Sequence, residues 1–146
     1  MQRHQHQLPI STPARGTRRS TLAFPNGLFG FESARDLTLV QSDSEHPFGW
    51  LECKGEQGPS FLVVEPQDVG QAYQPEISRE DAAALGLGGR DDTLVLAVVT
   101  HHDNGRLTLN LKSPIIINLK RGTGRQIIPR NVSAFTSQFP LEIHPE

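Results

Sequence analysis

The sequence predicts a mostly β protein, a small single-domain β-barrel-like fold with one short helix near residues 78–87 and a flexible N-terminal tail. Short runs of branched and aromatic residues recur along the chain and are separated by glycine, proline and asparagine, as in all-β domains. Residues 107–112 alternate leucine with threonine, asparagine and lysine, which is the period of a half-buried strand. Only one segment combines a capping residue, consecutive alanines and a glycine stop, so we expect one helix.

The predicted strands cover, in chain order, residues 21–24, 37–41, 48–53, 61–64, 94–100, 107–112, 115–117 and 124–128. The helix lies between the fourth and fifth of these, begins after Ser78 as its cap and stops at Gly86. Strands at this spacing favour a closed barrel or a sandwich over βαβ units. We expect a barrel because closure removes exposed sheet edges.

The length and composition favour one domain. A chain of 146 residues has the ordinary size of a single domain. Residues 1–20 are rich in glutamine, histidine, proline, serine and arginine and poor in apolar side chains. We therefore expect a disordered tail over residues 1–20 and the β-barrel domain over residues 21–146, and we expect the protein to be a monomer.

The predicted compartment follows from the lack of a membrane span and of a signal peptide, and the predicted lack of a cofactor follows from the single cysteine. No apolar run approaches the ~20 residues of a membrane span, and no signal-peptide core follows the N-terminal arginines. We therefore expect a cytoplasmic protein that does not enter a membrane. The single cysteine, Cys53, excludes a disulfide framework and a zinc site built on several thiolates. We expect neither a metal nor another cofactor.

Charge is unevenly distributed along the chain, although the net charge is only −2. Residues 1–31 carry four arginines and no acid, and residues 104–146 carry six basic and two acidic residues. Residues 32–103 carry 14 acidic against four basic residues, a net charge of −10. Such a block repels nucleic acid phosphates and favours a basic partner, and its simpler interpretation is a solvated acidic surface.

No residue pattern indicates catalysis, and we expect the protein not to be an enzyme. The strongest candidate is the cluster His101-His102-Asp103 at a strand end. Adjacent histidines on a strand point to opposite faces and do not readily share one metal. A small enzyme or metal site at this cluster remains an alternative hypothesis.

A nucleic-acid-binding module is the second alternative. It would use the arginine-rich tail and a basic stripe in the last part of the chain, formed by Lys112, Lys120, Arg121, Arg125 and Arg130. Aromatic side chains that would stack on bases are not interleaved with these residues. We therefore expect no direct nucleic acid binding.

Several motifs resemble those of the FliW family of flagellar assembly factors. They are FPNGLFGFE at residues 24–32, PFGWL at 47–51 with FLVVEP at 61–66, and LNLKSPIIIN at 109–118. The helix region 77–87 and the pair Arg125-Gln126 are also similar to that family. The resemblance spans about residues 22–130, in the same order and with similar spacing.

The resemblance implies a β-barrel-like fold without catalysis that binds two proteins. One is flagellin, through its terminal helical region, and the other is CsrA, a basic RNA-binding repressor of translation. A FliW protein that holds CsrA prevents it from repressing the flagellin message. Flagellin that accumulates captures FliW and frees CsrA, which regulates flagellin supply.

Two segments are the candidate binding sites for these partners. Within the acidic block, Glu65, Asp68 and Glu76 are the candidates for CsrA, because complementary potentials speed encounter. For flagellin, an amphipathic helix needs an apolar groove or edge, and Pro114 is expected to break a strand and expose backbone groups. The flagellin candidates are Asn110, Lys112, Ser113, Pro114, Ile115 and Asn118. The alternative interpretation of this segment is an ordinary strand–bend–strand that closes the barrel.

Overall fold

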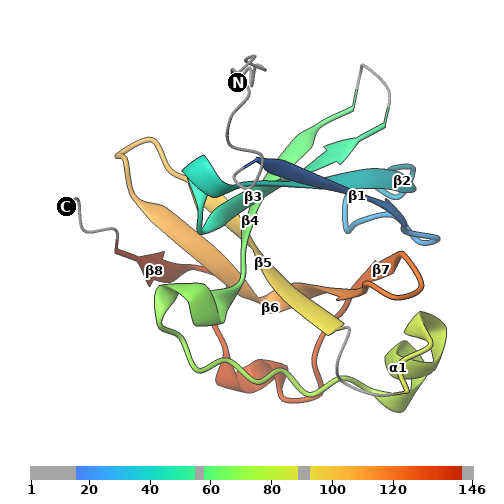
Figure 1. The fold of residues 1–146 in the computed structure, drawn as a ribbon. Coiled ribbons are helices and arrows are strands. Elements are labelled where there is room, and N and C mark those ends of the chain that lie inside the picture. The colour runs from blue at the N-terminus through green and yellow to red at the C-terminus, as the bar shows by residue number, and fades with distance from the viewer. Residues whose placement is uncertain (1–15, 55–57, 89–92, 143–146) are drawn as a thin grey trace.

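The structure is a computed structural model that describes residues 16–54, 58–88 and 93–142 (Figure 1). The described residues form the strands β1 (Thr17–Ala23), β2 (Asp36–Ser42), β3 (Phe48–Cys53), β4 (Ser60–Val64), β5 (Thr93–His101), β6 (Leu107–Asn118), β7 (Thr123–Gln126) and β8 (Phe139–Leu141). They also form the helix α1 (Arg79–Leu85) and the short 3-10 helices η1 (Asp43–Glu45), η2 (Pro66–Val69) and η3 (Val132–Ala134). Among the described residues, no helix is long and apolar enough to cross a membrane.

Seven of the strands close into a barrel, as predicted. Neighbouring strands follow the order β5-β4-β3-β2-β1-β7-β6, and β6 pairs again with β5. The shortest pairing in the ring is the one between β1 and β7. These strands are parallel and pair only at Ala23 and Thr123, where the Ala23 N–H donates to the Gly122 carbonyl at 2.8 Å. Strand β8 pairs with the first half of β6, outside the closed ring.

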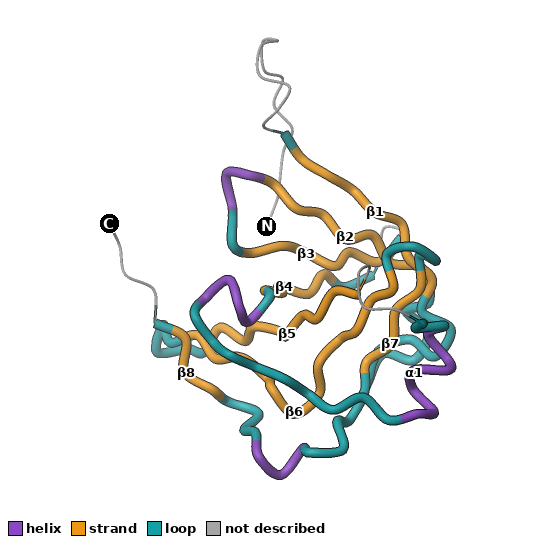
Figure 2. Tube along the Cα trace, turned by 60° about the horizontal axis from the view of Figure 1, so that its bottom comes forward, coloured by secondary structure: helices purple, strands orange, loops and turns teal. Residues whose placement is uncertain are grey.

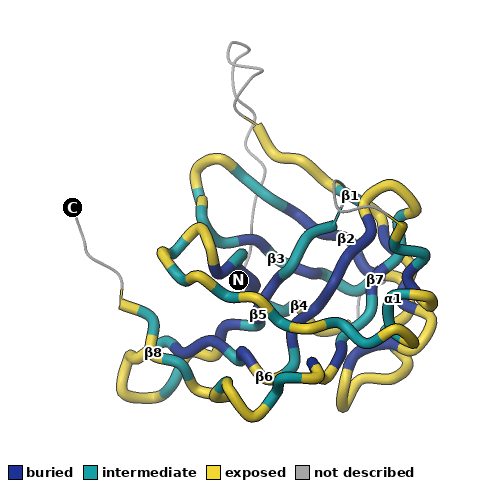
Figure 3. Tube along the Cα trace, turned by 90° about the horizontal axis from the view of Figure 1, so that it is seen from below, coloured by how far each residue is buried: buried dark blue, intermediate teal, exposed yellow. Residues whose placement is uncertain are grey.

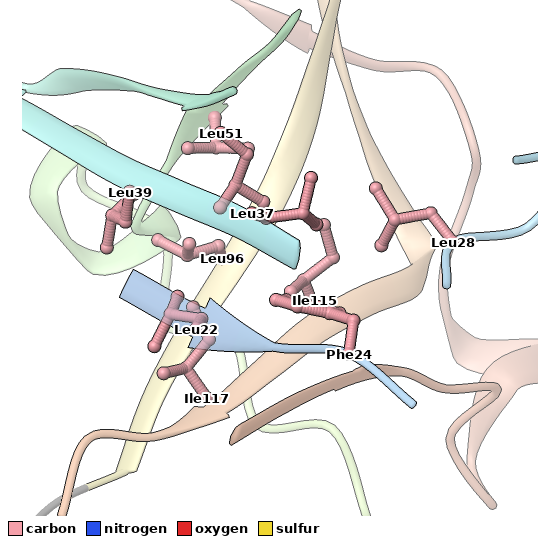
Figure 4. Packing of buried hydrophobic residues seen from close by; sticks show 10 residues of the cluster. Leu22, Phe24, Leu28, Leu37, Leu39, Leu51, Leu96, Ile115 and Ile117 are labelled. Carbon is pink, nitrogen blue, oxygen red and sulfur yellow. The ribbon is translucent and has the colours of Figure 1, made fainter. Parts of the chain in front are cut away.

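The hydrophobic core consists of three clusters. One fills the barrel interior, and the other two lie on the outer face of β5 and β6, one toward each end of these strands. Inside the barrel, leucine and isoleucine side chains of several strands point toward one another, as Figure 4 shows for Leu22, Leu39 and Leu96. On the outer face, α1 covers a cluster around Ile116, while η2, η3 and β8 cover a cluster around Leu109. Both faces of these strands are thus buried (Figure 3), which explains their long apolar runs.

Helix α1 begins and ends as the sequence predicts. The Ser78 hydroxyl oxygen accepts a hydrogen bond from the Asp81 N–H at 3.0 Å, which satisfies one of the free donors of the first turn. Gly86 closes the helix in the left-handed conformation at φ 69°, where a side chain would be strained.

Several strand boundaries differ from the prediction. Strand β1 begins at Thr17, so the predicted tail over 1–20 is too long at its end, and residues 1–15 lie outside the described residues. The side chains of its first five residues are polar, but its backbone pairs with β2 from Thr17–Ser42 onward. Strand β7 ends at Gln126 rather than Ile128. Strand β8 was not predicted, because three residues with a central proline carry no strand pattern.

The two strands predicted at 107–112 and 115–117 are one strand, β6, with a large bulge. Ile115 pairs with Leu96 of β5, whereas Asn110 pairs with Val98, so residues 111–114 lie opposite Ala97 alone. We call residues 111–114 the β6 bulge. It lies between the half of β6 that pairs with β8 and the half that pairs with β7.

Candidate functional site

The β6 bulge is the segment predicted to bind flagellin, and its backbone groups are already bonded within the chain. The Leu111 N–H donates to the Thr136 carbonyl at 3.0 Å, and the Leu111 carbonyl accepts from the Tyr73 hydroxyl at 2.6 Å. The Pro114 carbonyl accepts from the Ile127 N–H at 3.0 Å. Pro114 therefore interrupts the ladder with β5, but these groups are not free for a partner.

Half of the predicted flagellin residues are buried and serve the fold. Pro114 and Ile115 are buried, and Asn118 is only 5% exposed. The Asn118 amide donates to the Leu85 carbonyl at the end of α1, at 2.8 Å. Its Oδ1 accepts from the backbone N–H groups of Lys120 (3.1 Å) and Arg121 (3.2 Å) in the turn to β7. These three residues are therefore not available to a partner in this structure.

The other three predicted flagellin residues remain at the surface. Lys112 is exposed, and Asn110 and Ser113 are half-buried. The Asn110 amide donates to the Ser113 hydroxyl at 3.1 Å, and its Oδ1 accepts from the Lys112 N–H at 3.0 Å. Asn110 thus fixes the outer shape of the β6 bulge.

Gln126 connects the β6 bulge with the loop between β1 and β2. Its Nε2 donates to the Ser113 carbonyl at 3.1 Å, while its Oε1 accepts from the Phe29 N–H at 2.8 Å. The preceding residue, Arg125, points away toward α1, where its Nε donates to Asp81 at 2.8 Å. In the pair Arg125-Gln126, Arg125 thus contacts α1, whereas Gln126 contacts the β6 bulge and the β1–β2 loop.

Three large apolar side chains on the β1–β2 loop and beyond Gln126 are exposed, and the sequence did not predict this. Phe29 is 49% exposed, and Ile128, two residues after Gln126, is 54% exposed. Phe31 is 45% exposed and rests edge-on against Phe61, with ring centroids 5.1 Å apart. We call Phe29, Phe31 and Ile128 the apolar rim. A phenylalanine in a β-rich sequence carries no sign of whether it is buried, so the sequence held no signal for this surface.

The three acidic residues predicted to contact CsrA do not form one cluster. Glu65 immediately precedes η2 and Asp68 lies within it, with the Asp68 carboxylate 3.7 Å from His46 Nε2. Burial, and then the neighbouring Asp68 charge, raise the pKa of Glu65. Glu76 lies further along the connection from η2 to α1, which runs beside β5 and β6 (Figure 2), and its backbone bonds to Arg130 and Asn131.

Glu65 and Asp68 lie at the rim of a pocket of about 130 Å³ at one end of the barrel. The pocket opens where β1 and β4 meet η1 and η2, and its apolar lining includes Leu39, Val63 and Leu96. The apolar rim lies at the opposite end, where β1 ends and β2 begins. The two candidate surfaces are therefore separated by the length of the barrel.

Residues of the two alternative sites, the histidine cluster and the basic stripe, make contacts within the fold. His102 Nε2 lies 2.8 Å from the Thr108 hydroxyl across the β5–β6 hairpin, whereas His101 is exposed at the end of β5. Within the part of the chain that the structure describes, no three His, Cys, Asp or Glu side chains gather as a metal site would require. The predicted basic stripe is interrupted, because Arg125 is paired with Asp81.

Comparison with known proteins places the chain among its relatives. The sequence profile of the FliW protein family matches residues 10–141. The chain belongs to the FliW family. The flagellar assembly factor FliW of Leptospira biflexa serovar Patoc is 39% identical over 115 residues, which cover 77% of this chain and 75% of that protein. FliW of Natranaerobius thermophilus is 33% identical over 122 residues, covering 82% and 80%.

A solved FliW structure has the same fold. The crystal structure of the flagellar assembly factor FliW aligns with a TM-score of 0.72 and 25% sequence identity, covering 87% of each chain. The resemblance inferred from the motifs is thus confirmed, and so is the mostly β barrel with one helix. In this FliW-family chain, Gln126 joins two of the motif segments that first indicated the family.

Proposed function

We propose that this chain is a cytoplasmic flagellar assembly factor that binds flagellin and CsrA and antagonises CsrA, without catalysing a reaction. One observation carries the proposal beyond family membership. The barrel has two chemically different surfaces at its opposite ends, an acidic one around Glu65 and Asp68 and the apolar rim around Gln126. Two partners of different chemistry match two such surfaces.

The acidic end suits the basic partner. Glu65 and Asp68 belong to a block with a net charge of −10, whose field attracts a basic protein and repels RNA. CsrA held by this surface is separated from its message. Glu76 contributes to the same field from a more distant position.

The apolar rim suits the helical partner. An amphipathic helix binds by placing its apolar face on exposed apolar side chains, and Phe29 and Ile128 offer two. Gln126 connects them to Asn110, Lys112 and Ser113, which provide polar groups at the edge of the contact. The flagellin site that we propose therefore combines three of the residues predicted from the sequence with the apolar rim.

Calorimetric titration tests the proposal. The full-length protein is titrated separately with the flagellin and the CsrA of its own organism, and then with one in the presence of the other. Simple stoichiometric binding of each partner is the expected result, and the third titration shows whether one partner displaces the other. A folded protein that binds neither, or that binds RNA with a steep salt dependence instead, would overturn the proposal in favour of the nucleic acid alternative.

Matched variants locate the flagellin site. Phe29→Ala and Ile128→Ser are expected to weaken flagellin binding about tenfold or more while CsrA binding stays unchanged. Leu119→Ser is the control, because Leu119 is as exposed, at 46%, but lies in the turn between β6 and β7. An equal loss in all three variants would show that the apolar rim has no special role.

A further inference from the structure

The pocket between η1 and η2 has the size of a single side chain. Its volume is about 130 Å³, about ten times what one water molecule requires and less than half of the smallest typical small-molecule site, ~300 Å³. A cavity of this size at the end of a barrel excludes a large cofactor. It accommodates one long side chain of a partner protein.

The lining of the pocket selects the chemistry of that side chain. Leu39, Val63 and Leu96, at most 2% exposed, form the apolar base of the pocket, and the half-buried Pro47 and Phe48 complete an apolar lining that suits a hydrocarbon stem. The polar lining carries three carboxylates against one guanidinium, from Asp43, Glu65, Asp68 and Arg18. The pocket thus combines an apolar floor with a net negative rim, which is complementary to an aliphatic stem with a positive end.

We propose that this pocket receives one arginine or lysine side chain of the basic protein partner, with Glu65 and Asp68 binding its charged group. The inference rests on the proposed function and names the contact that makes the acidic end specific. The stem of the incoming side chain packs on the apolar lining of the pocket, and the partner surface covers the rim. Arg18, which also lines the pocket, carries a positive charge that disfavours a second cation.

The two carboxylates are available for this contact. Asp68 is 31% exposed, and its ion-pair partner His46 is 69% exposed and lies 3.7 Å away, so the pair is weak and open to exchange. Glu65 accepts one long hydrogen bond, 3.5 Å from Gln67 Nε2. Burial and then Asp68 raise the pKa of Glu65, and Gln67 and His46 offset this only in part, so the charged form is incompletely compensated in the free protein. A bound cation provides that compensation.

The chain offers a charge-matched control for the test. The variant Glu65→Gln/Asp68→Asn removes two negative charges at the pocket, and Asp36→Asn/Glu80→Gln removes two from exposed residues that do not line it. Affinity for CsrA is measured by calorimetry, and the thermal midpoint of each variant shows that it is folded. The pocket variant is expected to bind CsrA at least about tenfold more weakly, while the control loses about threefold or less. Equal losses would overturn the inference, because general attraction would then explain them.

A small probe tests the pocket without a protein partner. N-acetyl-arginine methylamide is added to the ¹⁵N-labelled protein, and amide shifts are followed by NMR. Shifts at pocket residues such as Gly49 and Val64 are expected with the wild type at about 10 mM probe, a level that saturates a site with a dissociation constant of ~1 mM. They are expected to be absent in Glu65→Gln/Asp68→Asn and with N-acetyl-glutamate methylamide. Failure of CsrA to bind would overturn the proposed function, whereas a pocket that does not respond to the arginine probe would overturn this inference.

Discussion

The side-chain oxygen of Gln126 accepts a hydrogen bond from the backbone N–H of Phe29 at 2.8 Å, across 97 residues of sequence. The other end of the same amide donates to the Ser113 carbonyl in the β6 bulge. One side chain at the end of β7 therefore holds the loop that carries the apolar rim against the segment predicted to bind flagellin. This arrangement makes the shape of that surface depend on a residue that the partner need not touch.

Gln126→Ala is expected to lower the free energy of unfolding by about 1–2 kcal/mol, since it removes two hydrogen bonds from a half-buried position. Urea denaturation measures the change. Gln126→Glu is the informative comparison, because it keeps an acceptor for Phe29 and loses the donor to Ser113. Its loss is expected to lie between those of the wild type and Gln126→Ala. A full loss in Gln126→Glu would show that the bond to Ser113 provides most of the stabilisation.

Asn118→Ala is expected to destabilise the fold by about 2–3 kcal/mol, because it leaves the buried Leu85 carbonyl and two turn N–H groups without their partner. Asn110→Ala is expected to cost about 1 kcal/mol, since Asn110 is only half-buried. Thermal unfolding of both variants measures the difference. A stable Asn118→Ala variant with reduced flagellin binding would instead support the original expectation that Asn118 contacts the partner.

The Arg125–Asp81 ion pair is expected to contribute about 1 kcal/mol of coupling between β7 and α1. The pair is short, 2.8 Å, and its side chains are 27% and 16% exposed, so solvent screens it less than an open surface pair. A double-mutant cycle with Arg125→Ala and Asp81→Ala measures the coupling at low and high salt. Additive losses would show that the pair contributes nothing beyond its separate side chains.

The sequence predicted elements best where local patterns decide the structure. The Ser78 cap, the alanines of α1 and the Gly86 stop all lie within one segment, and the helix formed at these residues. The span 48–53 and the barrel class were also correct. Strand β1 was missed at its polar start because backbone pairing with β2, rather than burial of side chains, forms it.

The candidate site depended on contacts that are distant in sequence. Pro114 was expected to expose backbone groups, but Tyr73, Thr136 and Ile127 reach the β6 bulge from other segments and bond to it. Likewise, Glu65 and Glu76 are equally acidic in sequence, and only the course of the chain places one at a pocket. Periodicity and charge do not contain this information, because it arises when the barrel closes.

Glu65→Gln is expected to raise the free energy of unfolding at neutral pH. Burial and Asp68 raise the pKa of Glu65 in the folded state above its ordinary value of 4.5, so the folded protein binds this proton more tightly than the unfolded chain. Wild-type stability therefore falls as the pH rises from 4.5 through the raised pKa. The glutamine variant lacks this loss.

Urea denaturation from acid to neutral pH tests this prediction, with the advantage of Glu65→Gln expected at pH 7 and absent below the ordinary pKa of 4.5. The comparison is repeated in a His46→Gln background, since His46 Nε2 lies 3.7 Å from the Asp68 carboxylate. A variant less stable than the wild type at pH 7 would show that Glu65 has a stabilising partner. The expected result, a gain in stability with a loss of CsrA affinity, is the trade-off typical of a carboxylate retained for binding rather than for the fold.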